Sequence, residues 1–278
     1  MEGLDIKFDD SDLKLFSGEQ LNEEDDPLEV MASAKKSMVL FFVIDVSTSM
    51  RGEKINAMNQ AMSEVLPELI GIGGSTTDIK IAVLEFSSGF EWKTPEPISL
   101  EQYQNWPTLC ADGVTDLGAA LIELNSKMSR NEFLQSVSLS YAPVTFLITD
   151  GYPTDNYQKG IESLKKNNWF KHGIKIALAI GDGVDKNVLS DFTGDSEFVV
   201  EAKNVKNLMS LVRAISVTSS QIGSSSMPVK ENDEGDTEFS EMDVEDSKQK
   251  EMKKAIKEMK QDIMMDSDGS ILSFEDGW

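Results

Sequence analysis

Hydrophobic residues in the middle of the chain follow two patterns, short continuous apolar runs and longer stretches with helical spacing. The clearest run, Met38–Ile44, predicts a strand that is buried on both faces. A second run, Val144–Thr149, follows Pro143, a residue that is tolerated at the first position of a strand. Ile174–Ile180 and Phe198–Val200 predict two further strands. Strands of this kind indicate a parallel sheet that is covered on both sides.

The segments between these runs predict amphipathic helices. Residues 53–70 carry apolar side chains at the spacing of one helical stripe, namely Ile55, Met58, Ala61, Met62, Val65, Leu66 and Leu69. Helices are also expected over 115–128, 154–170, 186–192 and 205–217. Strands and helices that alternate at this interval predict crossover connections, and hence an α/β fold with a doubly wound, mostly parallel sheet.

One pair of strands departs from the parallel pattern. The runs 78–86 and 90–94 are separated only by Ser87-Ser-Gly89, and so short a turn requires that the two strands be antiparallel. We therefore expect a six-stranded sheet with one antiparallel edge strand. Residues 95–114 contain three prolines and no clear period, which predicts a surface connection.

Charged residues concentrate at the two ends of the sequence. The formal net charge is −23; residues 1–30 carry 11 acids against two lysines, and residues 224–278 carry 16 acids against seven lysines. The residues between them carry a net charge of only about −5, so they offer no basic stripe for a phosphate backbone. We expect no nucleic-acid partner.

Composition thus divides the chain into three parts. We predict an acidic disordered tail over 1–35, an α/β domain over 36–220, and an acidic tail over 221–278. Within the last part, Met252, Ile256, Met259 and Ile263 recur at helical spacing, which predicts an amphipathic helix near 247–265. This helix could pack on its own domain, dock on a partner, or remain solvated.

The chain has one cysteine, Cys110, which excludes an internal disulfide and which we expect to be a small packed residue. No apolar stretch approaches the ~20 residues needed to cross a bilayer. The N-terminus is acidic where a secretion signal would be basic. These features predict a cytoplasmic protein that does not bind membranes.

Side chains with oxygen donors lie at the ends of two of the predicted strands. Asp45-Val-Ser47-Thr-Ser49 follows the first strand, and Asp150 follows the strand over 144–149. The carboxyl ends of parallel strands share one edge of the sheet, where ligand sites lie, and Thr115 at a helix start can point to the same edge. Mg²⁺ prefers about six hard oxygen ligands, and two carboxylates leave it able to attract a further acidic group. A purely structural interpretation is that Ser47 or Ser49 caps the following helix.

This set resembles the metal-ion-dependent adhesion site of von Willebrand factor A domains, which combines Asp-x-Ser-x-Ser with a distant Thr and a distant Asp, usually followed by Gly. The resemblance implies that Ser47, Ser49 and Thr115 coordinate Mg²⁺ directly, with Mn²⁺ possible. It implies that Asp45 and Asp150 act largely through bound waters, and that a carboxylate of a protein partner takes the last position. It also implies a von Willebrand factor A, Rossmann-like fold.

Three loop motifs narrow the resemblance. These motifs look most like those of the bacterial branch associated with tellurium resistance and stress signalling. They are Ser49-Met-Arg-Gly52, Thr115-Asp-Leu-Gly-Ala-Ala-Leu121 and Thr149-Asp-Gly-Tyr-Pro-Thr-Asp155. Members of that branch are often encoded with protein kinases and phosphatases. The resemblance therefore implies a role in stress response or in kinase- or phosphatase-linked signalling, with such an enzyme as a possible partner.

Two other functional classes compete with a binding module. A phosphotransferase of the haloacid dehalogenase type would carry a second Asp two residues after the first, where this chain has Ser47. With neither a Ser-His-Asp set nor a phosphate-binding loop, we predict no enzymatic activity, no catalytic residue and no nucleotide cofactor. The other alternative is a scaffold that acts through its acidic tails and whose metal is architectural.

Two further aspartates have structural interpretations. We expect Asp155 to cap the helix that begins near Thr154 rather than to bind metal. Asp116 either favours the helix N-terminus beside it or supports a metal ligand from the second layer. The sequence alone leaves both interpretations of Asp116 open.

Overall fold

The computed structural model describes residues 35–70, 77–103, 106–135, 140–181, 183–202, 217–218, 230–231, 237–238, 250–258 and 261. The chain divides into two units, Met1–Ala34 and Lys35–Trp278, and the described residues belong to the second. The disordered tail predicted over 1–35 therefore lies outside the described residues except for Lys35.

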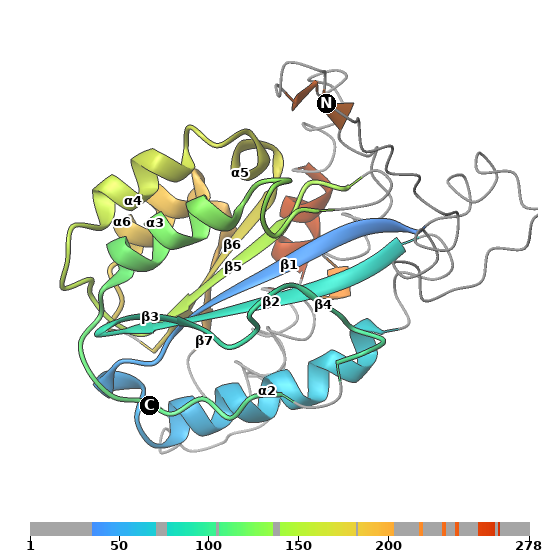
Figure 1. The fold of residues 1–278 in the computed structure, drawn as a ribbon. Coiled ribbons are helices and arrows are strands. Elements are labelled where there is room, and N and C mark those ends of the chain that lie inside the picture. The colour runs from blue at the N-terminus through green and yellow to red at the C-terminus, as the bar shows by residue number, and fades with distance from the viewer. Residues whose placement is uncertain are drawn as a thin grey trace, which may run out of the picture. The chain divides into compact units, whose positions relative to one another are not determined.

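Strands and helices alternate along the second unit (Figure 1). The strands are β1 (Lys36–Asp45), β2 (Thr77–Ser87), β3 (Gly89–Trp92), β4 (Ile98–Ser99), β5 (Val144–Thr149), β6 (Ile174–Ile180), β7 (Val199–Ala202), β8 (Lys230–Glu231) and β9 (Thr237–Glu238). The α-helices are α2 (Glu53–Leu69), α3 (Leu117–Lys127), α4 (Tyr157–Leu164), α5 (Asn168–His172) and α6 (Lys186–Thr193). Two 3₁₀ turns, η2 (Thr48–Met50) and η3 (Ser196–Phe198), complete the set.

The main sheet has the strand order β3-β2-β1-β5-β6-β7. All neighbours are parallel except β3, which is antiparallel to β2, so the doubly wound sheet with an antiparallel edge strand is confirmed. A seventh strand, β4, also pairs antiparallel with β2, inside the segment 95–114 for which we expected only a connection. It has two residues, too few to produce a periodic pattern. β8 and β9 form a separate two-stranded sheet.

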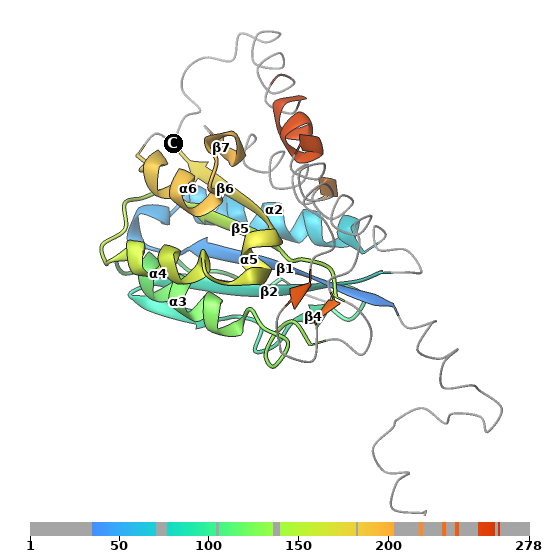
Figure 2. The ribbon, with the colours of Figure 1, turned by 90° about the horizontal axis from the view of Figure 1, so that it is seen from above.

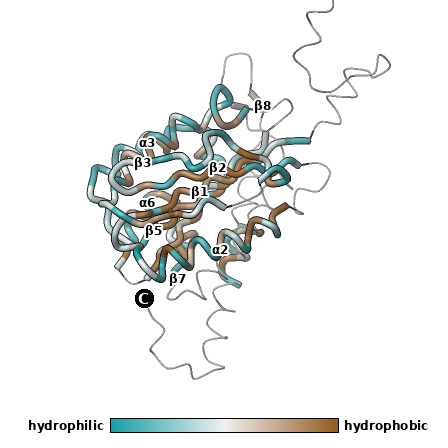
Figure 3. Tube along the Cα trace, turned by 60° about the horizontal axis from the view of Figure 1, so that its bottom comes forward, coloured by the Kyte–Doolittle hydropathy of each residue, from teal (hydrophilic) through white to brown (hydrophobic). Residues whose placement is uncertain are grey.

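Alternation along β1 divides the core into two layers. Even-numbered residues from Met38 to Ile44 face the cluster that includes the apolar stripe of α2. Val39, Phe41 and Val43 face the opposite cluster, formed with α3, α4, α5 and α6. Figures 1 and 2 show these helices on the two sides of the sheet, and Figure 3 shows hydrophobic residues concentrated along the central strands. This arrangement leaves the carboxyl ends of β1 and β5 side by side.

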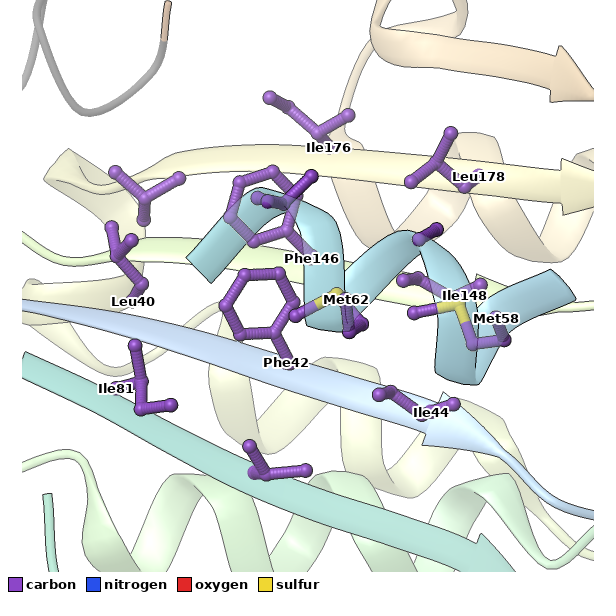
Figure 4. Packing of buried hydrophobic residues seen from close by; sticks show 14 of the residues in the cluster. Leu40, Phe42, Ile44, Met58, Met62, Ile81, Phe146, Ile148, Ile176 and Leu178 are labelled. Carbon is purple, nitrogen blue, oxygen red and sulfur yellow. The ribbon is translucent and has the colours of Figure 1, made fainter. Parts of the chain in front are cut away.

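The α2 side of the core is centred on two aromatic rings. Phe42 of β1 and Phe146 of β5 stack with ring centroids 4.8 Å apart and an interplanar angle of 9°. Met58 and Met62 of α2 lie over them (Figure 4). Phe42 is fully buried, so this pair joins the two strands that carry the predicted site.

The helix predicted over 154–170 is two helices, α4 and α5. The break lies at Asn167, whose side-chain oxygen accepts hydrogen bonds from the backbone N–H groups of Trp169 and Phe170. This is an N-cap, which starts a new helix by satisfying donors that lack a partner in its first turn. Cys110 is exposed rather than packed, because its neighbour Leu109 takes the buried position.

Part of the amphipathic helix predicted near 247–265 packs on the domain. Residues 250–258 are helical, and Met252 and Ile256 are buried in the α2-side core. Lys253 Nζ lies 2.6 Å from Asp195 Oδ2 and 2.9 Å from Glu197 Oε2, and these carboxylates raise the pKa of Lys253 to about 12. Met259, Ile263 and nearly all of the helix predicted over 205–217 lie outside the described residues. None of the helices in the described ranges combines the length and hydropathy needed to cross a bilayer.

This packing predicts a loss of stability when the apolar stripe is shortened. Met252→Ala removes a fully buried side chain, so we expect the free energy of unfolding to fall by about 2–4 kcal/mol in urea denaturation. Lys257→Ala is the matched control, because Lys257 is exposed on the same helix and should change stability by less than about 0.5 kcal/mol. Equal effects of the two substitutions would contradict the packing.

Candidate metal centre

Asp45 lies at the end of β1, beside the end of β5. Its Oδ2 atom accepts a hydrogen bond of 2.5 Å from Thr149 Oγ1, and its Oδ1 atom accepts one of 2.8 Å from the backbone N–H of Ser47. The parallel register of the two strands, with Ile44 opposite Ile148, brings these groups together. Thr149 was not among the predicted site residues, although its position immediately before Asp150 could have identified it.

The two serines connect β1 to Asp150. Ser47 Oγ and Ser49 Oγ lie 2.9 Å apart, and Ser49 Oγ donates to Asp150 Oδ1 at 2.7 Å. Ser47 and Asp150 are buried, whereas Ser49 is exposed. Neither serine caps α2, because the N-cap residue of that helix is Gly52 and no side chain caps it. The capping interpretation of the serines is therefore wrong.

Thr115 joins this group from a third segment. A methyl group placed on Gly151 would lie 3.6 Å from Ser49 Oγ and 3.7 Å from Thr115 Oγ1, so both hydroxyls lie beside Gly151. The Thr115 backbone is held by Thr154 in both directions: its N–H donates to Thr154 Oγ1 at 3.1 Å, and its carbonyl accepts from Thr154 N at 2.8 Å. The structure thus brings all five predicted donor residues to one edge of the sheet.

The loop before Thr115 is tied to the loop after β1. The backbone N–H and the side-chain hydroxyl of Thr48 both donate to the carbonyl of Gly113, at 3.0 and 2.9 Å. Asp112 N donates to the carbonyl of Val46 at 2.7 Å. Gly113 has φ = 87°, a conformation that glycine adopts without a steric penalty. These bonds fix where Thr115 enters the site.

Asp116 and Asp155 brace the same loops, and neither side chain caps the helix that follows it in the sequence. Asp116 Oδ2 accepts from Gly89 N at 3.0 Å and its Oδ1 from Thr154 Oγ1 at 3.1 Å, so its carboxylate supports the loop that holds Thr115. Asp155 accepts from the N–H groups of Gly118 and Ala119 in the first turn of α3, at 2.8 and 2.9 Å. The prediction that Asp155 caps the helix starting near 154 is wrong, because Asn156 takes that position and accepts from Lys159 N.

The electrostatics of the two carboxylates differ. Burial raises the pKa of Asp45, while the hydrogen bonds from Thr149 and Ser47 partly oppose this shift and the nearby charge of Asp150 adds to it. The carboxylate of Asp150 instead forms an ion pair with Lys54, at 2.6 Å from Nζ to Oδ2. The hydrogen bonds to Asp45 thus come from neutral donors, whereas Asp150 has a cationic partner in addition to the Ser49 hydroxyl.

This donor set fits a hard divalent cation. It offers two carboxylates and three hydroxyls, oxygen ligands of the kind that Mg²⁺, Ca²⁺ and Mn²⁺ prefer. Within the described ranges there is no cluster of three or more His, Cys, Asp or Glu side chains that could hold a metal. The two carboxylates carry a charge of −2 when ionised, which does not exceed the charge of a divalent cation, so a bound cation would remain able to accept a further anionic ligand.

Comparison with known proteins matches this chain to one protein family. Residues 40–214 match the family model of the von Willebrand factor type A domain. The inter-alpha-trypsin inhibitor heavy chain H1 of Bos taurus is 30% identical over 161 residues, which are 53% of this chain and 17% of that protein. The chain thus spans less than a fifth of the bovine relative.

Solved structures show the same fold at low identity. Proximal thread matrix protein 1 from the mussel byssus is similar with a TM-score of 0.53 and 17% identity, over 68% of this chain and 49% of that one. A further structure of the mussel protein is described with a zinc-occupied MIDAS motif. The pilus adhesin SpaC of Lactobacillus rhamnosus GG, in an open conformation, gives a TM-score of 0.51 and 13% identity over 68% and 31% of the two chains.

The family match covers more than half of the chain, and it includes the second half of β1, all of β5 and the loops that carry the five donor residues. The chain belongs to the von Willebrand factor type A domain family.

Proposed function

We propose that this protein is a metal-dependent interaction module that binds Mg²⁺, or alternatively Mn²⁺, and docks an acidic side chain of a partner protein on it. The observation that carries the proposal is the convergence of Asp45, Asp150 and three hydroxyls at the carboxyl edge of the sheet. Ser47, Ser49 and Thr115 would hold the cation directly, and the two aspartates would hold its waters. The bound cation would supply the positive charge that attracts a carboxylate.

Exposed hydrophobic side chains next to these donors indicate which kind of residue flanks the acidic residue of the partner. Val114, which precedes Thr115, is 48% exposed, and Tyr152, which follows Gly151, is 62% exposed. Aromatic residues are enriched at protein interfaces because they bury a large area at a small entropic cost. We therefore expect the partner to present its acidic residue beside apolar ones.

The cellular role is a finer part of the proposal. The resemblance of the loops around Ser49, Thr115 and Asp150 to the tellurium-resistance branch supports an intracellular, cytoplasmic role in stress response, with a kinase or phosphatase as partner. Binding rather than catalysis is supported by Ser47, since it occupies the position where a phosphotransferase of the haloacid dehalogenase type would carry its proton-transferring Asp.

Selection of peptides from a random library tests the docking function. The full chain is used as the target in buffer with Mg²⁺ and, in parallel, with a chelator. We expect the Mg²⁺ selection to enrich peptides with Asp or Glu beside an apolar residue, and the chelator or Asp45→Asn to remove this enrichment. The same peptides recovered with chelator would contradict the proposal.

The scaffold alternative is separated by a deletion. Removing residues 264–278 takes away acidic sequence but spares Met252 and Ile256, which pack in the core. A deletion from 224 would also remove this packing and would confuse loss of stability with loss of binding. A metal-dependent module keeps its peptide binding after the shorter deletion, whereas a scaffold acting through that part of the tail loses its partner and still binds metal.

A further inference from the structure

Lys54 brings a positive charge into the candidate metal centre. It is the second residue of α2, and its Nζ atom lies 2.6 Å from Oδ2 of Asp150. The Asp150 side chain is fully buried and the Lys54 side chain is 22% exposed. The other oxygen of Asp150 accepts the hydrogen bond from Ser49, so Lys54 and a proposed metal ligand share one carboxylate.

The position of this lysine is unfavourable for the helix alone. The first turn of an α-helix carries a partial positive charge from its unpaired N–H groups, so a cation there is repelled rather than attracted. The attraction between Lys54 and Asp150 offsets this repulsion. The ion pair also reduces the cost of burying the Asp150 carboxylate, which would be high without a partner. The position of Lys54 is thus explained by the site and not by the helix.

A charge count shows what Lys54 does to the site. Asp45 and Asp150 together carry −2 when ionised, and Lys54 reduces this to −1. A divalent cation would therefore give a neutral site without Lys54 and a site of charge +1 with it. Since both carboxylates are buried and Lys54 is in contact with one of them, one unit of charge has a large effect on the binding of either a cation or an anion.

We propose that Lys54 is a built-in counter-cation that weakens binding of the divalent cation and strengthens binding of an acidic ligand to the loaded site. This inference rests on the proposed metal-dependent docking function and identifies the residue that tunes it. It follows from linkage that the acidic ligand raises the affinity for the cation by the same factor as the cation raises the affinity for the ligand. Lys54 therefore shifts the affinities for the two ligands in opposite directions.

The test is calorimetric titration of Mg²⁺ into the full chain and its variants. Lys54→Met and Lys54→Gln remove the charge, and we expect both to bind Mg²⁺ on the order of tenfold more tightly than wild type. Lys54→Arg keeps the charge and should stay within about threefold of wild type. Lys166→Met is the matched control, because Lys166 is an exposed lysine just beyond α4, and it should leave Mg²⁺ affinity unchanged.

Acetate serves as the probe for the acidic ligand. Mn²⁺ binding is followed by the electron paramagnetic resonance of the free ion, with sodium acetate compared with sodium chloride at equal ionic strength. We expect acetate to tighten Mn²⁺ binding more in wild type and Lys54→Arg than in Lys54→Met and Lys54→Gln. An equal effect in all four proteins would overturn the part of the proposal that concerns the ligand.

The outcomes separate this inference from the function on which it rests. Unchanged or weaker Mg²⁺ binding in both Lys54→Met and Lys54→Gln, with Asp45→Asn still defective, would overturn the role of Lys54 and leave the metal site intact. Two neutral variants are used so that poor folding of one does not decide the result. If the wild type binds neither Mg²⁺ nor Mn²⁺, the proposed function and the inference both fail.

Discussion

Asp45→Asn is expected to weaken Mg²⁺ binding roughly 100-fold while leaving the protein without added metal at least as stable as wild type at pH 7. The first effect follows from removing one of the two carboxylates of the site. The second follows from burial: the Asp45 side chain is shielded from water, and the resulting cost of its charge raises its pKa. Asparagine can accept from Ser47 N and pair with Thr149 without carrying that charge.

The raised pKa also gives a pH dependence with a definite sign. The folded protein holds the Asp45 proton more tightly than the unfolded chain, in which the pKa of an aspartate is about 3.9. Stability contributed by this group is therefore lost as pH rises from the unfolded value through the raised folded value. In urea denaturation without metal, the free energy of unfolding of Asp45→Asn should increase relative to that of wild type as pH increases over this range.

Asp112→Asn is the control for both measurements. Asp112 belongs to the loop bonded to the Asp45 loop, but its side chain is 81% exposed and pairs with Arg51 at the surface. Its replacement should change Mg²⁺ affinity by less than about threefold and stability by less than about 0.5 kcal/mol. If Asp45→Asn destabilised the metal-free protein by several kcal/mol, Asp45 would be a structural residue rather than one maintained for a ligand.

Phe42→Ala is expected to lower the free energy of unfolding by about 3–5 kcal/mol. Phe42 is fully buried, stacks on Phe146 and packs under α2, so truncation leaves a cavity between the two strands that end at the site. A loss of this size is a large part of the ~5–15 kcal/mol that stabilises a typical domain. Chemical denaturation measures it.

Phe90→Ala is the matched control, because it removes the same side chain from β3, where Phe90 is 46% exposed. Its replacement should cost no more than about 0.5 kcal/mol. Similar losses for the two phenylalanines would contradict the two-layer core described above.

The strands that carry the site could be predicted because strands that are buried on both faces contain continuous runs of apolar residues. Every residue of β5 and all but the first of β1 are buried, so continuous apolar runs marked them, and the donors at their ends followed. The break between α4 and α5 could not be predicted from apolar spacing, because it depends on one side-chain cap at Asn167. Asp155 was assigned to the wrong helix because α3 approaches it only in the tertiary fold.

Thr149 and Lys54 were missed for different reasons. Thr149 was included in the strand pattern, which accounted for it without suggesting a hydrogen bond to Asp45. Lys54 follows the Asp-x-Ser-x-Ser motif by five residues and carries the wrong charge for the start of a helix. That conflict with the helix dipole is visible in the sequence and could have identified Lys54 as a residue of the site.

The central position of β1 has a consequence for synthesis of the chain. The strand lies between β2 and β5 in the sheet. Leu40 is opposite Ile81 of β2 on one side and opposite Val144 of β5 on the other. A ribosome that adds ~5–20 residues per second makes β1 long before β5 emerges, so one edge of the apolar run Met38–Ile44 stays unpaired for roughly 5–20 s. During that interval the nascent chain presents Asp45 and both serines without Asp150, and β1 is the segment on which a ribosome-associated chaperone would act.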